Sequence, residues 1–258
     1  MSGAVPKVRI RGLAKSFGEK KVLESVDLDI MAGTSLVVIG GSGTGKSVLI
    51  KCVLGLIEPD AGTIEIAGEN VLALSGRARR AMYARIGMLF QNGALFDSLP
   101  VWENVAFGLI ARHRVRRAEA RARAGEILGQ VGLEPDVGAL FPHELSGGMQ
   151  KRVALARAIA ATPEILFFDE PTTGLDPIMG AVIDGLIVDC VKRLGSTAIA
   201  ITHDMASARR IGDRAAMLHG GRIVWDGPAG SLFDSGNPYV EQFTHGSREG
   251  PIRMELRG

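Results

Sequence analysis

A glycine-rich segment has the residue types and spacing needed to grip a chain of phosphates. It consists of Gly40, Gly41, Ser42, Gly43, Thr44, Gly45, Lys46 and Ser47, in the pattern G-x-x-x-x-G-K-[ST]. Glycines let backbone N–H groups point inward around phosphate oxygens, and the helix that follows adds its positive end. Lys46 is expected to reach the β- and γ-phosphates, and the Ser47 hydroxyl to bind Mg²⁺. The alternative is a chance glycine turn, but the apolar run 35–39 before it and the helix-like run 47–54 after it favour a nucleotide site.

Two acidic residues follow another apolar run, 165–168. Asp169 is placed to hold Mg²⁺ through water, which leaves Glu170 to polarise an attacking water molecule. General-base assistance of this kind contributes about 10²- to 10⁴-fold to a rate. Taken alone, two acids at the end of a strand fit an ordinary solvated turn equally well. Together with the phosphate-binding loop they predict hydrolysis of a nucleoside triphosphate.

A second anion-binding loop, without a lysine, occurs in the segment L-S-G-G-M-Q at 145–150. Ser146, Gly147 and Gly148 precede a predicted helix at 151–161, and a helix N-terminus attracts anions. Two such loops in one chain are most simply explained if this one covers the nucleotide held by another copy. The sequence therefore predicts a head-to-tail pair of chains with two shared sites.

The elements that position these loops read as an α/β fold. Short apolar or alternating runs predict strands at 8–10, 22–23, 26–30, 35–39, 63–66, 86–90, 165–168 and 197–201, with a hairpin of 215–218 and 222–225. Between about 101 and 161, alanine, arginine, glutamate and leucine dominate and predict a helical subdomain. The candidate groups follow the carboxyl ends of continuous apolar strands, where open α/β sheets bind their ligands.

Composition excludes several classes of function. The 258 residues are 46% hydrophobic and 22% charged, which is typical of a folded globular protein, and the net charge of +2 gives no case for nucleic acid. We find no apolar run near the roughly 18–20 residues that cross a bilayer, and we expect no secretory signal. Cys52 and Cys190 are expected to be buried thiols in a reducing cytosol.

Taken in order along the chain, these motifs resemble the ABC transporter ATPase family, whose own signature is L-S-G-G. The resemblance implies that Phe17 stacks on adenine, although many members have Tyr there. It implies that Gln91 contacts Mg²⁺ with Ser47 and Asp169 and senses a membrane partner. Asp176, in G-L-D, is similar to the aspartate at the family's dimer seam, and His203 to the histidine that contacts the γ-phosphate.

The resemblance also implies the fold, a P-loop NTPase of the ABC ATPase type. Such a fold has a RecA-like core, an antiparallel β subdomain and an inserted helical subdomain. The expected ATPase domain spans 1–235, with its core at 1–92 and 162–235 and the helical subdomain at 93–161. Residues 236–258 are expected to form a C-terminal tail.

The segment 87–107, G-M-L-F-Q-N-G-A-L-F-D-S-L-P-V-W-E-N-V-A-F, is similar to the ATPases of MCE-type, Mla-like phospholipid transporters. Met149 and the tail residues Gln242, Phe243 and 250–252 suit the same group. The resemblance implies a homodimer that drives a permease through the surface from Phe96 to Phe107. It also implies a periplasmic MCE protein, a small STAS-domain subunit, and a place on the cytoplasmic face of the bacterial inner membrane.

Other interpretations remain open at this point. The apolar residues of 96–107 could be core rather than an interface. The chain could serve an amino-acid, metal or other importer, or act as a soluble ABC protein on ribosomes or DNA. A basic cluster comprises Arg112, Arg114, Arg116, Arg117, Arg121 and Arg123. It reads as a solvated helix face, with contact to anionic lipid as the alternative.

Overall fold

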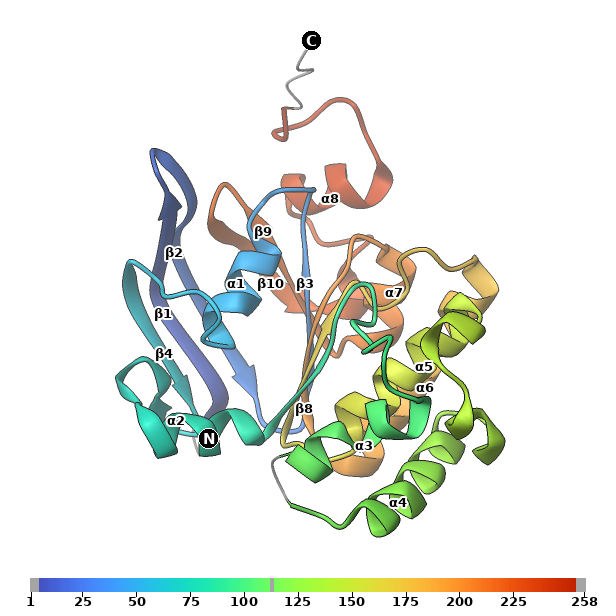
Figure 1. Cartoon of the computed structure of the whole chain (residues 1–258). Helices are drawn as coiled ribbons and strands as arrows, with labels where there is room; N and C mark the ends of the chain where they lie inside the picture. The colour runs from blue at the N-terminus through green and yellow to red at the C-terminus, as the bar shows by residue number, and fades with distance from the viewer. Residues whose placement is uncertain (1–4, 112–113, 254–258) are drawn as a thin grey trace. The chain divides into compact units, whose positions relative to one another are not determined.

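The computed structural model describes residues 5–111 and 114–253. Over these residues the chain forms two compact units, the first comprising 5–73 and 201–253 and the second 74–200. Both units combine helices and strands (Figure 1), in agreement with the predicted α/β class. The predicted helical subdomain, 93–161, lies entirely within the second unit.

The first unit contains an antiparallel sheet in the order β2-β1-β4-β5 (Figure 1). Its strands are β1 (Pro6–Phe17), β2 (Lys20–Met31), β4 (Ala61–Ile66) and β5 (Glu69–Asn70), and the 3-10 turn η1 (Val71–Ala73) follows. Buried side chains alternate with polar ones along β1, as expected of a sheet with one covered face. On the polar face, Arg9 pairs with Asp29 and Glu65, which lie opposite it on the two neighbouring strands.

The strands predicted at 22–23 and 26–30 are one continuous strand, β2. Leu13 of β1 pairs with Val26 of β2, and Lys15 pairs with Leu23. Two steps along β1 therefore match three steps along β2, and the register shifts by one residue. Such a bulge absorbs an extra residue without ending a strand. The residues between the two predicted strands, 24 and 25, therefore lie within β2.

The first unit also contains the strands that lead to the glycine-rich loop. In this unit, β3 (Ser35–Ile39) pairs in parallel with β9 (Arg214–His219), and β9 pairs antiparallel with β10 (Arg222–Pro228), which confirms the predicted hairpin. Every residue of β3 is buried, as the continuous apolar run indicates. The helices are α1 (Lys46–Val53), α7 (Met205–Ile211) and α8 (Pro238–His245), with a short turn η4 (Ala229–Ser231).

The segment predicted as a tail contains a helix. Asn237 caps α8 by accepting hydrogen bonds from the backbone N–H groups of Tyr239 and Val240, and Pro238 occupies the first helical position. Gly246 ends the helix in the left-handed conformation, with φ of 63°. Val240 and Gln242 are buried, so this part of the segment is packed against the unit.

The second unit carries the remaining elements. They are α2 (Gly76–Ala84), β6 (Ile86–Leu89), α3 (Val101–Ala111), α4 (Arg117–Gln130), η2 (Pro135–Ala139), η3 (Pro142–Glu144), α5 (Gly147–Ile159), β7 (Ile165–Asp169), α6 (Pro177–Leu194) and β8 (Thr197–Ile201). Strands β6 and β7 are parallel neighbours, with β8 on the other side of β7. Helices α3, α4 and α5 pack against one another (Figure 1).

Strand β6 and helix α5 in this unit differ from their predicted ranges. Strand β6 ends at Leu89, so Phe90 and Gln91 lie in the loop that follows. Helix α5 begins at Gly147 rather than at Lys151, because Ser146 caps it and both signature glycines form its first turn. Cys52 and Cys190 are buried free thiols, as predicted. Across 5–111 and 114–253, no helix combines the length and the apolar composition needed to cross a membrane.

Candidate nucleotide-binding and hydrolysis site

The glycine-rich loop connects β3 to α1 in the first unit. Gly40 has φ of 149°, and a Cβ there would fall on the main-chain oxygen of Leu218 in β9. Gly43 and Gly45 have φ of 74° and 102°, a region that side chains rarely adopt. The Thr44 hydroxyl donates to the oxygen of Gly41 at 2.9 Å and closes the turn. The backbone conformation therefore favours glycine at positions 40, 43 and 45, and the hydrogen bond that closes the turn requires a hydroxyl at position 44.

The loop and the start of α1 fit a triphosphate. Lys46 is buried, and its Nζ donates to the carbonyl oxygens of Gly40 and Gly41 at 2.7 and 2.8 Å. The ammonium is thereby held at the mouth of the loop, beside exposed Ser47. Among the described residues, no side chain caps α1 and no acid lies in its first turn. Its first N–H groups can therefore receive an anion.

Phe17 and His203 also belong to the first unit. Phe17 ends β1 with 49% of its surface exposed, and the Lys15 ammonium lies 5.5 Å from its ring centroid. An exposed aromatic face of this kind can stack on a base. His203 is exposed in the turn before α7. That turn is fixed because the Asp204 side chain accepts from the N–H groups of Ala206 and Ser207.

In the second unit, Asp169 ends β7 and Glu170 begins the next turn. Glu170 has φ of 48°, a left-handed conformation that costs a non-glycine residue on the order of 1–3 kcal/mol. Its Oε2 lies 3.1 Å from the Thr173 hydroxyl, which donates to it, and its main-chain oxygen accepts from the Thr173 N–H at 3.3 Å. The carboxylate is therefore held by its own turn.

The L-S-G-G segment and Asp176 lie close together in the second unit. The Ser146 hydroxyl caps α5 by accepting from the Met149 N–H at 3.3 Å. Asp176 caps α6 by accepting from the N–H groups of Ile178 and Met179, each at 3.0 Å. Met179 packs against Gly148, where a Cβ would lie 3.1 Å from its Cγ. The exposed Ser146 and Asp176 thus share one surface region of this unit.

Gln91 is exposed in the loop after β6, and its backbone is held by a residue that the sequence analysis missed. The Nζ of Lys151, in α5, donates to the main-chain oxygen of Gln91 and lies 3.5 Å from that of Glu170. The sequence did contain a signal for this contact. Lys151 lies three, four and seven residues before the buried Ala154, Leu155 and Ala158, and therefore on the same buried face of the helix. A charge on an apolar helix stripe indicates a buried polar contact.

The segment 96–107 divides between core and surface. Val101 and Val105 are buried, whereas Phe96 and Phe107 are each 42% exposed, with ring centroids 4.6 Å apart. Asn104, which is fully buried, accepts from the N–H of Phe96 and donates to the carbonyl oxygens of Phe96, Leu99 and Pro100. Phe96 therefore lies on a loop whose backbone is held by Asn104, and its ring meets that of Phe107 on α3.

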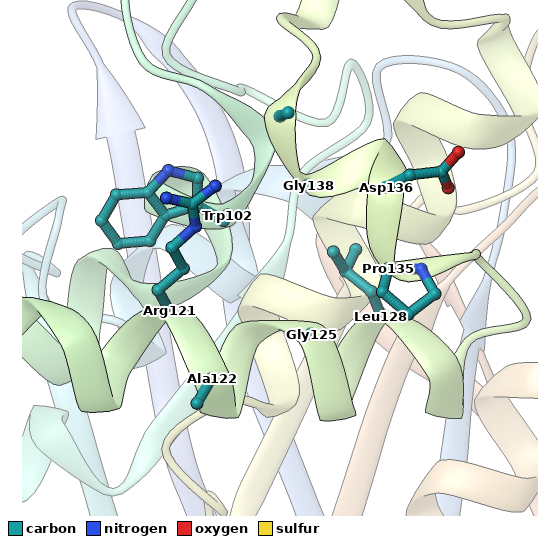
Figure 2. A pocket seen from close by; sticks show the side chains of 9 residues that line it. Trp102, Arg121, Ala122, Gly125, Leu128, Pro135, Asp136 and Gly138 are labelled. Atoms are coloured by element: carbon teal, nitrogen blue, oxygen red, sulfur yellow. The ribbon is translucent and has the colours of Figure 1, made fainter.

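A pocket of about 430 Å³ lies beside this segment in the second unit. Figure 2 shows the guanidinium of Arg121 over the indole ring of Trp102 at one end, and Pro135 and Asp136 at the other. None of the predicted nucleotide-site residues lines it. Arg117 pairs with Glu103, and Arg123 with Glu119, so these arginines of α4 form a solvated, paired helix face. Arg112, from the same cluster, lies outside the described residues.

The predicted site residues divide between the two units. The first carries Phe17, the loop from Gly40 to Ser47, and His203. The second carries Gln91, Ser146, Gly147, Gly148, Asp169, Glu170 and Asp176. Within the second unit, Lys151 links Gln91 to Glu170, and Met179 links the signature glycines to Asp176.

A buried strand that runs through a glycine-rich loop into a helix, and another strand that ends in two acids, define the class of P-loop nucleoside triphosphatases. A family model described as ABC transporter matches residues 23–173. The chain is 41% identical over 247 residues to the probable ribonucleotide transport ATP-binding protein mkl of Mycobacterium leprae, covering 96% of this chain and 71% of that protein. The chain therefore belongs to the ABC transporter family.

Two further relatives and two solved structures extend the comparison. The chain is 41% identical to the chloroplastic protein trigalactosyldiacylglycerol 3 of Arabidopsis thaliana, over 95% of this chain and 75% of that one. It is 42% identical to the methionine import protein MetN of Mesorhizobium japonicum, over 88% and 61%. A dimeric ATP-binding cassette in a post-hydrolysis state with ADP and Pi superposes with a TM-score of 0.79 at 32% identity, over 86% of this chain and 98% of that one. A Clostridium perfringens cassette of the cbiONQ complex gives 0.80 at 29%, over 89% and 91%.

The protein is accordingly an ABC transporter ATPase that uses ATP and Mg²⁺. Cassettes of this family act as dimers with a membrane permease. Bound Mg²⁺ supplies positive charge that neutralises the phosphate oxygens during phosphoryl transfer. Ser47 in the first unit, and Asp169 and Gln91 in the second, each carry an oxygen donor of the kind that this ion prefers.

Proposed function

We propose that this chain energises phospholipid transport across or between bacterial membranes, through a separate permease and an MCE protein. Two copies bind two ATP molecules, and the closure of the dimer drives the permease. The chain then works at the cytoplasmic face of the inner membrane, and a small STAS-domain subunit belongs to the same complex. No part of this proposal involves nucleic acid.

The proposal assigns a role to each site residue. The loop from Gly40 to Ser47 binds the phosphates, with Lys46 neutralising the β- and γ-phosphates, and Phe17 stacks on adenine. Glu170 accepts a proton from the attacking water, and His203 donates to the γ-phosphate. Ser146, Gly147 and Gly148 cover the nucleotide held by the partner copy, and Asp176 lies at the seam. Ser47, Gln91 and Asp169 hold Mg²⁺.

The exposed aromatic pair of Phe96 and Phe107 is the observation that supports a permease interface, and the sequence of the segment that carries it supports lipid transport. These rings lie in the segment whose sequence resembles the ATPases of lipid transporters, and large exposed apolar side chains favour a protein interface. The relatives add support. The relative from Arabidopsis thaliana has a name that refers to a galactolipid, and its match covers 95% of this chain. The match to mkl is as broad, although that protein's name refers to ribonucleotide transport.

A solute importer is the second candidate, and one observation favours it. The methionine import protein of Mesorhizobium japonicum is 42% identical, which is as high as the other relatives. That match, however, takes in 88% of this chain, against 95% and 96% for the two relatives above. The broader coverage of the match to the relative named after a galactolipid favours the lipid-transport proposal.

Purification of the tagged chain with its partners tests the proposal. The complex is extracted from native membranes in detergent, and its components are identified by mass spectrometry. We expect a permease together with an MCE-domain protein. A matched variant, Phe96→Asp with Phe107→Asp, should lose the permease while its ATP binding is unchanged. Recovery of a permease with a soluble solute-binding protein would instead establish the importer, and ribosomal or DNA-bound partners would exclude both.

A further inference from the structure

Lys151 is a buried cation to which none of the roles above assigns a function. Its side chain points from α5 into the second unit, and the residue is 7% exposed. Its Nζ donates to the main-chain oxygen of Gln91 and, at 3.5 Å, to that of Glu170. One ammonium group therefore joins the loop after β6 to the turn after β7.

Lys151 also interacts electrostatically with the two acids that follow β7, Asp169 and Glu170. Burial lowers the pKa of its ammonium group, and the negative charges of Glu170 and Asp169 act in the opposite direction. A buried cation is costly unless it is paired or hydrogen-bonded. Here two carbonyl oxygens accept its hydrogen bonds, and the negative charges of the two acids favour its charged form. The position of Lys151 is thus coupled to that of the acid pair.

Glu170 needs external support for its backbone. Its left-handed φ of 48° is a conformation that persists only where surrounding contacts impose it. The contact with Thr173 lies within the same turn, whereas the contact with Lys151 comes from a different element. A shift of Lys151 would therefore change the direction in which the carboxylate points.

Helix α5 holds the loop after β6 at a second point. Arg157 donates to the carbonyl oxygens of Gly93 and Ala94 at 2.6 and 2.7 Å. Asn104 holds the following residues, beginning with Phe96. A continuous series of contacts therefore runs from the exposed ring of Phe96, through the loop and Lys151, to the backbone of Glu170.

We propose that Lys151 is a positioning residue that transmits the state of the partner-facing loop to Glu170, so that a permease bound to this loop sets the alignment of the general base. The proposal rests on the roles given above to Glu170 and to segment 96–107. It predicts that Lys151 affects the hydrolysis step and leaves ATP binding unchanged.

Steady-state ATP hydrolysis by the purified chain tests this role. Lys151→Met removes the charge at similar size, and we expect kcat to fall by about tenfold or more while KM for ATP stays within about twofold. Lys151→Arg retains a cation with several donors and should restore at least half of the activity. Lys192→Met, at an exposed lysine of α6, is the matched control and should behave as wild type.

A double-mutant cycle separates transmission from local damage. Arg157→Met releases the loop from α5 at the second point and should lower kcat in the wild-type background. In the Lys151→Met background the same change should have little further effect, because the connection to Glu170 is already broken. Additive losses would mean that the two contacts act independently, and the proposal would be wrong.

The remaining outcomes are also decisive. Glu170→Gln is measured in parallel: if it stays active, the general-base assignment fails, and with it the basis of this proposal. If Glu170→Gln is inactive but Lys151→Met keeps its kcat, only the role of Lys151 is refuted. If Lys151→Met does not fold, Lys151→Gln takes its place, and failure of both to fold would make Lys151 a purely structural residue.

Discussion

At the scale of single residues, the chemistry depends on a few groups with fixed surroundings. Lys46 is held by two loop carbonyls, Glu170 by a strained turn, and Ser146 by the first turn of α5. Each is therefore positioned before a nucleotide arrives, which is the condition under which electrostatic stabilisation costs no reorganisation.

Glu170→Gln should abolish turnover while preserving nucleotide binding. The amide keeps the size and the hydrogen bond to Thr173 but cannot accept a proton at neutral pH, so we expect hydrolysis to fall by about 10²- to 10⁴-fold. Phosphate release measures turnover, and gel filtration with light scattering measures the trapped dimer in MgATP. A variant that stays monomeric and keeps full turnover would contradict this role.

The two cysteines should be unreactive in the native protein. Burial raises the pKa of Cys52 to about 11 and also raises the pKa of Cys190. Because a raised pKa keeps each thiol protonated near neutrality, alkylation should accelerate only as the pH rises well above 8. With iodoacetamide at pH 8, an exposed Ser98→Cys control should react about 100-fold faster. Equal rates in the native state would show that the helices expose these thiols.

At the scale of elements, the loop between β6 and α3 shows how one side chain can fix a surface. Asn104 is buried in α3, and its amide uses both its acceptor and its donor side on the backbone of 96–100. The rings of Phe96 and Phe107 therefore stay in contact with each other while both remain partly exposed.

Asn104→Ala should destabilise the protein and loosen this loop. It leaves backbone groups of Phe96 and Leu99 without their partner, at a cost of about 1–3 kcal/mol of unfolding free energy. Urea denaturation followed by circular dichroism measures the change. Asn92→Ala, in the exposed part of the preceding loop, is the control and should be close to neutral. Wild-type stability in Asn104→Ala would show that the clamp contributes nothing.

Two glycines in the second unit should respond to alanine in opposite directions. At Gly125, in the middle of α4, a new Cβ meets nothing within 4 Å, so Gly125→Ala should stabilise the fold by about 0.5–1 kcal/mol. At Gly87, in β6, the Cβ would overlap the main-chain oxygen of Ala158, so Gly87→Ala should destabilise by about 1–3 kcal/mol. Thermal melts of the pair test the packing, and two shifts of the same sign would contradict it.

At the scale of the whole molecule, the function requires two chains. The exposed Ser146 and Asp176 share a surface region of the second unit, whereas the loop that carries Lys46 belongs to the first. Solved relatives include a dimeric cassette with ADP and Pi. In the proposed head-to-tail arrangement, each site would combine Lys46 of one copy with Ser146 of the other.

Mixing two inactive variants tests this arrangement. Lys46→Ala and Ser146→Arg should each lose hydrolysis, the second because a bulky cation replaces the hydroxyl cap. In a head-to-tail pair, one mixed dimer contains one intact site and one doubly altered site. An equal mixture with free exchange should regain about one quarter of the wild-type rate. No recovery, with dimers present by light scattering, would place both loops in the same chain's site.

The sequence by itself determined the chemistry of this protein. Phosphate-binding loops and paired acids are local patterns, because a glycine turn, a helix N-terminus and a strand end can each be recognised within a few neighbouring residues. Gly40 to Ser47, Asp169, Glu170 and Ser146 were predicted in this way, and the buried strands and the hairpin predicted beside them are confirmed. Helix boundaries were less predictable, since the first turn of α5 is made of glycines whose propensity disfavours a helix.

Only the tertiary structure decided which residues support this chemistry. Lys151 contacts carbonyls that are 60 and 19 positions away in the sequence, and no local pattern encodes such partners. The same holds for the division of 96–107 into buried Val101 and Val105 and exposed Phe96 and Phe107, since apolar side chains serve core and interface alike. Burial and long-range hydrogen bonding are properties of the packed chain, and they decide which of the predicted residues can act.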